Sequence, residues 1–242
     1  MTQILFYGFG EAGQAFASGW NEALSGKLSA YDLNTKIALP LGVQMHKLPA
    51  AALQNAHLIF CLVTADQALA AAKTAAPFLK PGTYWLDGNS CSPGAKSKAS
   101  GVIEAAGGKY VDLAIMAPVH PKLHATPCLL GGPHAEEIND TLQKLGMDVR
   151  VMGEKVGDAS TIKMLRSVMI KGLEALTAEC LLAARRAAGD GSVEPMGMPA
   201  LAPGPLVLEH GGGQKHRHRA SLEPILERFQ ELDQRVLVEI GR

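Results

Sequence analysis

Residues 3–13, QILFYGFGEAG, carry the clearest structural signal in the chain. The apolar run at residues 3–7 predicts a strand, and Phe16 and Trp20 then follow at the spacing of one helix face. The glycines between them form the pattern G-x-G-x-x-G, in the strand-to-helix context that gives this pattern its meaning. Such a turn brings backbone amides and a helix N-terminus up to a pyrophosphate. We therefore expect a dinucleotide to contact Gly8, Phe9, Gly10, Glu11, Ala12 and Gly13.

Strands and helices alternate through the first 155 residues. Further strands are predicted at residues 28–31, 57–63, 83–86, 110–119, 128–130 and 148–152. Helices are predicted after Thr64, which begins a capping-box spacing, after Ser92, which precedes Pro93 as an N-cap, and at residues 133–145. The nearly unbroken apolar run at 57–63 is typical of a parallel strand that is covered on both faces. The alternation predicts an α/β fold, with a doubly wound, mostly parallel Rossmann sheet over residues 1–155.

From residue 156 onward the pattern is helical, and we expect a smaller, all-helical C-terminal region at 156–242. Apolar residues recur every three or four positions through 158–188, which predicts one long helix. Residues 189–221 are rich in Gly and Pro and are expected to be irregular, whereas the amphipathic pattern at 222–240 predicts a last helix. Long helices in such domains often pack between subunits, so a homodimer is expected by analogy.

The composition favours a small-molecule ligand. Lys and Arg total 23, as do Asp and Glu, so no net field attracts nucleic acid or an anionic membrane. The four cysteines form no CxxC pair and fit a reducing compartment, so we expect a cytoplasmic protein. No apolar run has the length of a bilayer-spanning segment, and the N-terminus has no signal-peptide pattern. No metal site is expected, because His216 and His218 match no zinc-ligand spacing.

Asp32 ends the second predicted strand, where an acidic side chain can accept hydrogen bonds from the adenosine ribose. Its charge would repel the 2'-phosphate of NADP. The expected cofactor is therefore NAD or NADP, with NAD favoured, although Lys36 lies near enough in sequence to weaken that preference. Val63 and Thr64, at the end of the strand predicted at 57–63, are expected to line the same cofactor.

Four motifs together resemble the β-hydroxyacid dehydrogenases, the group of the 6-phosphogluconate and 3-hydroxyisobutyrate dehydrogenases. They are GFGEAG at 8–13, DGNSCSP at 87–93, VDLAIMAPVHP at 111–121 and GDASTIKM at 157–164. The resemblance extends to about residue 188 and is stronger than any single motif, because the four occur in the family's order. It implies a NAD(P)-dependent oxidoreductase that transfers a hydride between the nicotinamide and the CH–OH group of a small hydroxy acid.

The resemblance also implies where the substrate lies. Asn89 and Ser90 match the family's segment beside the nicotinamide, so Asn89 is assigned to both cofactor and substrate. Val119 and His120 stand in the family's substrate-carboxylate segment, where a serine and two glycines are usual, and this departure leaves the identity of the substrate open. Arg166 occupies the turn where the family usually has an asparagine, and an arginine there could bind a carboxylate through two hydrogen bonds.

Lys163 matches the family's catalytic lysine on the long helix, which implies that it exchanges a proton with the substrate hydroxyl. Two alternatives stay open. An imine or pyrroline reductase also joins a Rossmann domain to helices, and assays with alcohol and imine substrates would separate the two. The other is a nucleotide-binding relative with an incomplete, inactive substrate domain, since the sequence after the long helix is short and irregular.

Overall fold

The computed structural model describes residues 2–20, 24, 26–40 and 42–187. The predictions for residues 189–221 and 222–240 therefore lie outside the described residues. The density of contacts divides the chain into two units, Met1–Leu165 and Arg166–Arg242. The expected division of the chain at residue 155 into a cofactor domain and a helical domain stays a prediction.

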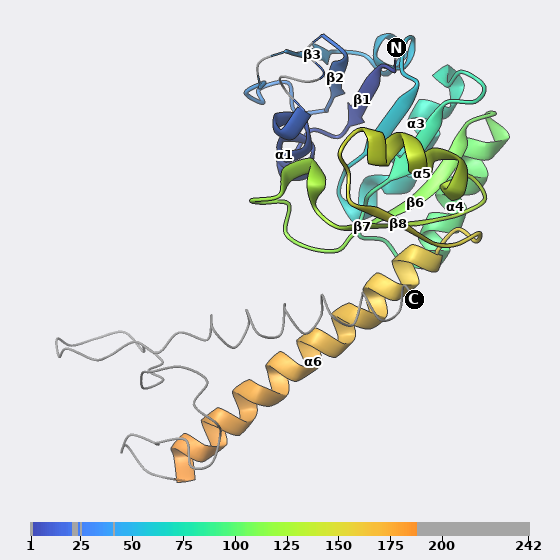
Figure 1. Cartoon of the computed structure of the whole chain (residues 1–242). Helices are drawn as coiled ribbons and strands as arrows, with labels where there is room; N and C mark the ends of the chain where they lie inside the picture. Colours follow the sequence, from blue (N-terminus) through green and yellow to red (C-terminus); the bar gives the residue numbers. More distant parts are fainter. Residues whose placement is uncertain (1, 21–23, 25, 41, 188–242) are drawn as a thin grey trace. The chain divides into compact units, whose positions relative to one another are not determined.

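The first unit is built on one eight-stranded sheet (Figure 1). Its strands are β1 (Ile4–Tyr7), β2 (Leu28–Tyr31), β3 (Val43–His46), β4 (Leu58–Cys61), β5 (Tyr84–Asp87), β6 (Lys109–Ile115), β7 (Cys128–Gly131) and β8 (Val149–Gly153). Their spatial order is β3-β2-β1-β4-β5-β6-β7-β8, and each neighbouring pair is parallel except β6 with β7. The mostly parallel, Rossmann-type α/β sheet predicted from the sequence is confirmed. The winding reverses between β1 and β4, the kind of position where open α/β sheets bind their ligands.

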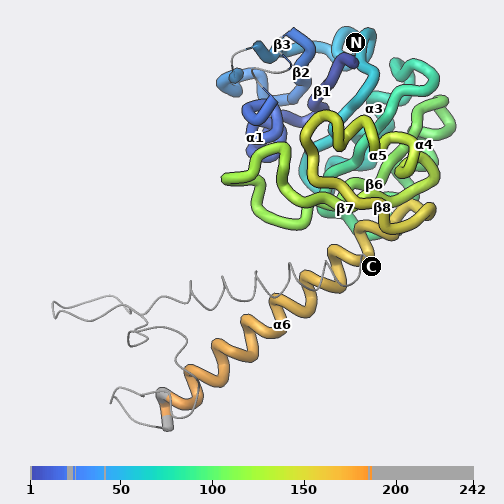
Figure 2. The backbone as a smooth tube through the Cα atoms, in the orientation of Figure 1, coloured from blue at the N-terminus to red at the C-terminus, as the bar shows by residue number. Residues whose placement is uncertain are grey.

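Helices cover both faces of the sheet because side chains alternate along each strand. The helices are α1 (Glu11–Trp20), α2 (Pro49–Leu53), α3 (Ala68–Ala75), α4 (Pro93–Ala105) and α5 (Ala135–Lys144), with 3-10 turns η1 (Ala65–Gln67), η2 (Ala76–Phe78) and η3 (Leu123–Ala125). In β1, Ile4 and Phe6 join the core that includes buried residues of α1 and α5, whereas Leu5 and Tyr7 join the core that includes those of α2, α3 and α4. Figure 2 traces the chain through these successive crossings, from β1 to β8.

Some details of the sequence-based prediction differ from the structure, among them the strand predicted at 110–119, which is β6 and ends at Ile115. The strand β3 and the short helix α2 were not predicted, because β3 has only one buried residue, Val43, and α2 is five residues long. The capping box expected at Thr64 is wrong, since Thr64 makes no side-chain capping bond and the 3-10 turn η1 precedes α3. The N-cap at Ser92 is confirmed, because its hydroxyl accepts a hydrogen bond from the Ala95 amide at 3.3 Å and Pro93 follows as the first helical residue.

The long helix predicted at 158–188 is observed as α6 (Asp158–Ala187), drawn from yellow to orange in Figure 1. Its apolar stripe carries exposed side chains at Leu165, Met169, Leu173 and Leu176, and Val168 is 72% exposed. None of the described helices combines the length and hydrophobicity that crossing a membrane requires.

The N-cap of α4 provides a test of the fold. Replacing Ser92 with alanine leaves the Ala95 amide without its side-chain acceptor, so the free energy of unfolding should fall by about 1 kcal/mol. Urea unfolding followed by circular dichroism would measure the loss. Ser97→Ala is the matched control, because Ser97 is exposed on the same helix and its hydroxyl bonds only the Pro93 carbonyl, at 3.0 Å, so this variant loses no capping bond and should keep near wild-type stability. Equal stability of wild type and Ser92→Ala would contradict the observed cap.

Candidate functional site

The glycine-rich turn lies between β1 and α1, next to the point between β1 and β4 where the winding of the sheet reverses. Gly8 has a φ of +94°, and a Cβ there would come within 2.5 Å of the Leu62 carbonyl oxygen, so only glycine fits. A Cβ on Gly13 would lie 3.0 Å from the Gly8 oxygen, which reflects the close approach of α1 to the turn. At Gly10, by contrast, a Cβ would meet no atom within 4 Å. The backbone at Gly10 is therefore open to a ligand from outside.

Asp32 holds this turn in place. One of its carboxylate oxygens accepts a hydrogen bond from the Phe9 amide at 2.7 Å, and the other accepts one from the Asn34 amide, also at 2.7 Å. Asp32, which the sequence predicts to bind the ribose, thus also anchors Phe9, the second residue of the glycine pattern. Each carboxylate oxygen can accept a further hydrogen bond, so these contacts leave capacity for ribose hydroxyls.

The end of β4 lies beside the turn, and β5 is the next strand after β4 in the sheet. A Cβ on Gly8 would touch Val63 Cγ1 at 2.7 Å, which brings Val63 against the glycine pattern, and Thr64 is the next residue along the chain. After β5, the Asn89 side-chain amide donates to Asp87 Oδ1 at 2.7 Å and to Cys61 Sγ at 3.4 Å. Asn89 is 5% exposed, and its Oδ1 atom has no hydrogen-bond partner within the described residues. A buried acceptor without a donor fits a site that a ligand completes.

Lys163 and Ser90 are brought together from sequence positions far apart. Ser90 follows Asn89 at the end of β5, and Lys163 lies in the second turn of α6. The Lys163 ammonium donates to the Ser90 hydroxyl at 3.0 Å. The structure therefore joins two residues that the sequence assigned to substrate binding and catalysis separately.

A buried ionic cluster involves β5, which leads to Ser90, and the neighbouring strand β6. Lys96 is fully buried on α4, and its ammonium lies 3.0 Å from Asp87 Oδ1 and 3.3 Å from Asp112 Oδ1, both carboxylates being buried as well. Burial is the main factor that raises the pKa of the Tyr110 phenol, followed by the charge of Asp87, and the neutral phenol donates to Asp87 Oδ2 at 2.6 Å. Burial also raises the pKa of the Cys61 thiol, so this side chain stays neutral beside Asn89. Removing one member of such a cluster typically destabilises a protein by about 3–5 kcal/mol.

The sequence reading missed Lys96, although a signal was present. On α4, Lys96, Ala99 and Ile103 share one helix face, and Ala99 and Ile103 are buried apolar residues. A lysine in line with an apolar stripe is unusual, because an ammonium is almost never fully buried without a partner. Its position therefore indicated buried carboxylates on a neighbouring element.

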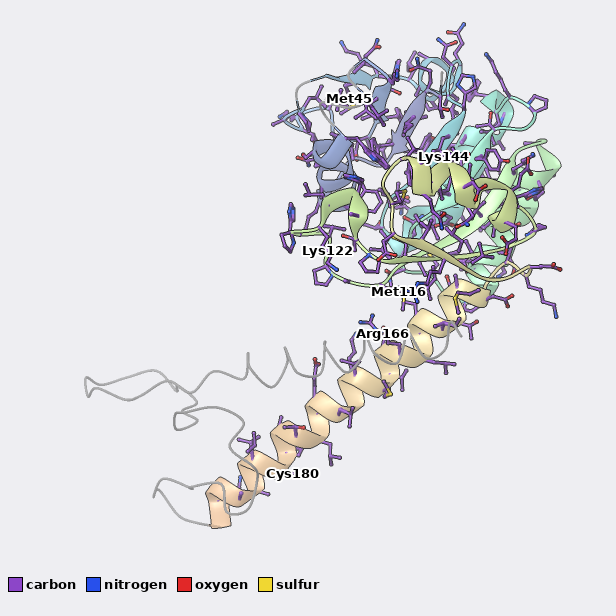
Figure 3. All side chains as sticks on the ribbon, in the orientation of Figure 1. Met45, Met116, Lys122, Lys144, Arg166 and Cys180 are labelled. Carbon is purple, nitrogen blue, oxygen red and sulfur yellow. The ribbon has the colours of Figure 1, made fainter. Side chains whose placement is uncertain are left out.

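The remaining predicted substrate residues lie in two other places. Val119, which is buried, and His120, which is exposed, belong to the connection between β6 and β7, the same connection that carries Met116 and Lys122 in Figure 3. The Val119 carbonyl accepts hydrogen bonds from the Thr126 hydroxyl and the Leu123 amide, which folds this connection back on itself. Arg166 lies on α6 and belongs to the second unit, so its role stays a prediction. Within the described residues, no cluster of His, Cys, Asp and Glu could hold a metal ion.

Residues 3–153 match the model of a family described as the NAD binding domain of 6-phosphogluconate dehydrogenase. The chain belongs to that family. The matched segment contains the glycine-rich turn, Asp32 and the motif after β5, and it makes this part of the chain an NAD-binding domain.

Relatives of known sequence or structure support the assignment. An uncharacterised 28.5 kDa protein of Methanothermus fervidus is 32% identical over 76% of this chain and 71% of its own length. A crystal structure of a conserved hypothetical protein from Sinorhizobium meliloti is 39% identical, with a TM-score of 0.70, over 78% of this chain. The chain spans 66% of that protein's length. A conserved protein of unknown function, described as structurally similar to 3-hydroxyacid dehydrogenases, is 32% identical with a TM-score of 0.65, over 76% of this chain and 70% of its own.

More distant solved structures share the fold. The V8 variant of an imine reductase from Myxococcus stipitatus, in complex with NAD+, has a TM-score of 0.68 at 20% identity, over 79% of this chain and 68% of its own. The 3-hydroxyisobutyrate dehydrogenase of Mycobacterium tuberculosis has a TM-score of 0.63 at 17% identity, over 85% of this chain and 77% of its own. At these identities the likeness concerns the fold alone.

The open backbone at Gly10 gives a direct test of the cofactor site. A methyl group there meets no protein atom, so Gly10→Ala should fold with wild-type stability but bind NADH more weakly, because the methyl group enters the space left for the pyrophosphate. Fluorescence titration with NADH would measure the affinity. Gly101→Ala is the matched control, since a Cβ at Gly101 on α4 also meets nothing within 4 Å, and its NADH affinity should be unchanged. Wild-type affinity in Gly10→Ala would contradict this placement of the cofactor.

Proposed function

We propose that the chain is an NAD-dependent oxidoreductase that interconverts a small hydroxy acid and the corresponding oxo acid. The observation that supports this most is the 3.0 Å contact between Lys163 and Ser90, next to the unpartnered Asn89 Oδ1. An amine and a hydroxyl at the carboxyl end of β5 can together bind and deprotonate an alcohol. We also propose that the protein works in the cytoplasm, in keeping with its free cysteines.

The residues of the turn fit NAD. Gly8 and Gly13 permit the tight packing, Gly10 leaves its backbone accessible, and α1 begins at Glu11, so its free amides face the turn. Asp32 would accept hydrogen bonds from the adenosine ribose while it holds the Phe9 amide. Val63, Thr64 and Asn89 would line the path toward the nicotinamide. We favour NAD over NADP because the Asp32 carboxylate would repel a 2'-phosphate.

The chain's own residues would handle the proton. Bound NAD supplies the hydride acceptor for oxidation, and in its reduced form the hydride donor for the reverse reaction. In the oxidation, Lys163 in its amine form accepts the hydroxyl proton as the C–H bond breaks, and its ammonium returns the proton in the reduction. Ser90 fixes the direction of the Lys163 Nζ atom.

A substrate carboxylate would need cationic or backbone donors to hold it. Val119 and His120 are our candidates from the β6–β7 connection, and Arg166 is the candidate from α6, where a planar guanidinium suits two-point binding of a carboxylate. Assays with hydroxy acids and with cyclic imines would separate the proposed activity from an imine reductase. Turnover of imines without turnover of any hydroxy acid would overturn the proposal.

The cofactor preference can be tested at Asp32. Wild-type protein should bind NADH more tightly than NADPH. In Asp32→Ser the affinity for NADH should fall, because the Phe9 tether and the ribose acceptor are both lost, and the ratio of the two affinities should narrow because the repulsive charge is gone. Asp140→Ser, an exposed substitution on α5, should leave both affinities unchanged. A wild-type protein that prefers NADPH would contradict the assignment of Asp32.

The role of Lys163 can be tested by removing its charge. Lys163→Met keeps most of the apolar stem, so the protein should fold and bind NADH normally, while kcat should fall by ~10²–10⁴-fold, the usual effect of losing a general acid or base. Lys171→Met, an exposed substitution further along α6, should retain full activity. If Lys163→Met turned over at the wild-type rate, the proposed proton transfer would be wrong.

A further inference from the structure

The proposed reaction makes no direct use of Lys96, the buried lysine on α4. Its ammonium donates to the Asp87 backbone carbonyl and to Asp87 Oδ1, and lies 3.3 Å from Asp112 Oδ1. One nitrogen atom thus contacts the last residue of β5 and a residue of the neighbouring strand β6. Burying three charged groups is costly unless they are closely paired, so the cluster is held to a narrow geometry.

The Asp87 arm leads from Lys96 to Ser90. Asp87 Oδ1 accepts hydrogen bonds from both the backbone amide of Asn89, at 3.0 Å, and its side-chain amide, at 2.7 Å. These two bonds fix the chain just before Ser90. Tyr110 occupies the other carboxylate oxygen, so Asp87 cannot rotate freely.

The Asp112 arm leads from Lys96 to Lys163. Asp112 Oδ2 accepts hydrogen bonds from the amides of Gly157, at 3.2 Å, and Ser160, at 2.9 Å, and Asp112 Oδ1 accepts one from the Ser160 hydroxyl at 2.6 Å. These amides begin α6, where a helix leaves its donors without internal partners. Asp112 therefore caps α6 from another element, and Lys163 lies three residues beyond Ser160, nearly one helical turn further along.

We propose that Lys96 is a positioning residue of the active site, which sets the contact between Ser90 and Lys163 by holding Asp87 and Asp112 at the same time. The two arms start at one ammonium; one ends on Asn89, the residue before Ser90, and the other on Ser160, three residues before Lys163. A residue that only filled space could be replaced by an apolar side chain of similar length. Holding Asp87 and Asp112 together instead requires the positive charge of Lys96. The predicted fall in kcat rests on the proposed function. The predicted placement of Lys163 against Ser90 does not depend on it.

Three full-length variants test the proposal. Lys96→Met removes the shared ammonium, and Ser160→Ala removes one hydrogen bond from the Asp112 arm while keeping all three buried charges. Lys98→Met is the matched control, because Lys98 is exposed on the same helix. The measurement is the rate of reductive methylation of Lys163 by formaldehyde and cyanoborohydride, followed by peptide mass spectrometry. It needs no substrate, so it remains informative if the proposed activity is wrong.

We expect faster methylation of Lys163 in Lys96→Met and Ser160→Ala than in wild type, and the wild-type rate in Lys98→Met. With a substrate, kcat of Lys96→Met should fall by about 10²-fold, as a misplacement of ~1 Å can cause, at unchanged NADH affinity. If Lys96→Met fails to fold, Ser160→Ala tests the Asp112 arm by itself, and an unchanged methylation rate in that variant would overturn the proposal. Wild-type methylation in the variants that fold, or a loss of NADH affinity parallel to the loss of kcat, would overturn the proposal.

Discussion

A single buried ammonium, that of Lys96, links the elements on which the site depends. Its two carboxylate partners lie on adjacent strands, and one of them caps the long helix α6. A buried charge must be satisfied wherever it occurs, so the ends of β5 and β6 and the start of α6 are held in one arrangement. Without Lys96, two buried carboxylates on neighbouring strands would repel each other at the edge where the ligand is expected.

The sheet then determines which residues meet at that edge. In a parallel sheet the carboxyl ends of neighbouring strands point the same way, and between β1 and β4 the helices leave toward opposite faces, the arrangement at which open α/β sheets bind their ligands. Gly8 follows β1, Val63 follows β4 and Asn89 follows β5, so three segments distant in sequence border one region. The glycine-rich turn provides backbone donors there, and the segment after β5 provides a hydroxyl and an amide.

Much of this arrangement could be predicted from the sequence, because it depends on local signals. Three such signals depend only on residues near them in the sequence: the strand-to-helix glycine pattern, the apolar run of β4 and the N-cap at Ser92. The edge strand β3 could not be found in this way, because it is short and mostly unburied and so lacks periodicity. The partners of Lys96 are tertiary contacts, and Asp112 lies on a different element, so no local pattern specifies the pairing. The second role of Asp32, as a tether for Phe9, likewise depends on how β2 and the turn meet in space.

We propose that the glycine-rich turn and the Asn89–Ser90–Lys163 group form one site that binds the cofactor. Intermolecular nuclear Overhauser effects between NAD+ and isotope-labelled protein test this directly. We expect contacts from the adenosine ribose to residues around Asp32, and from the nicotinamide ring protons to the side-chain amide of Asn89. A nicotinamide that contacts protein protons elsewhere, while the adenosine remains at Asp32, would contradict the proposed active site and leave only the cofactor-binding domain.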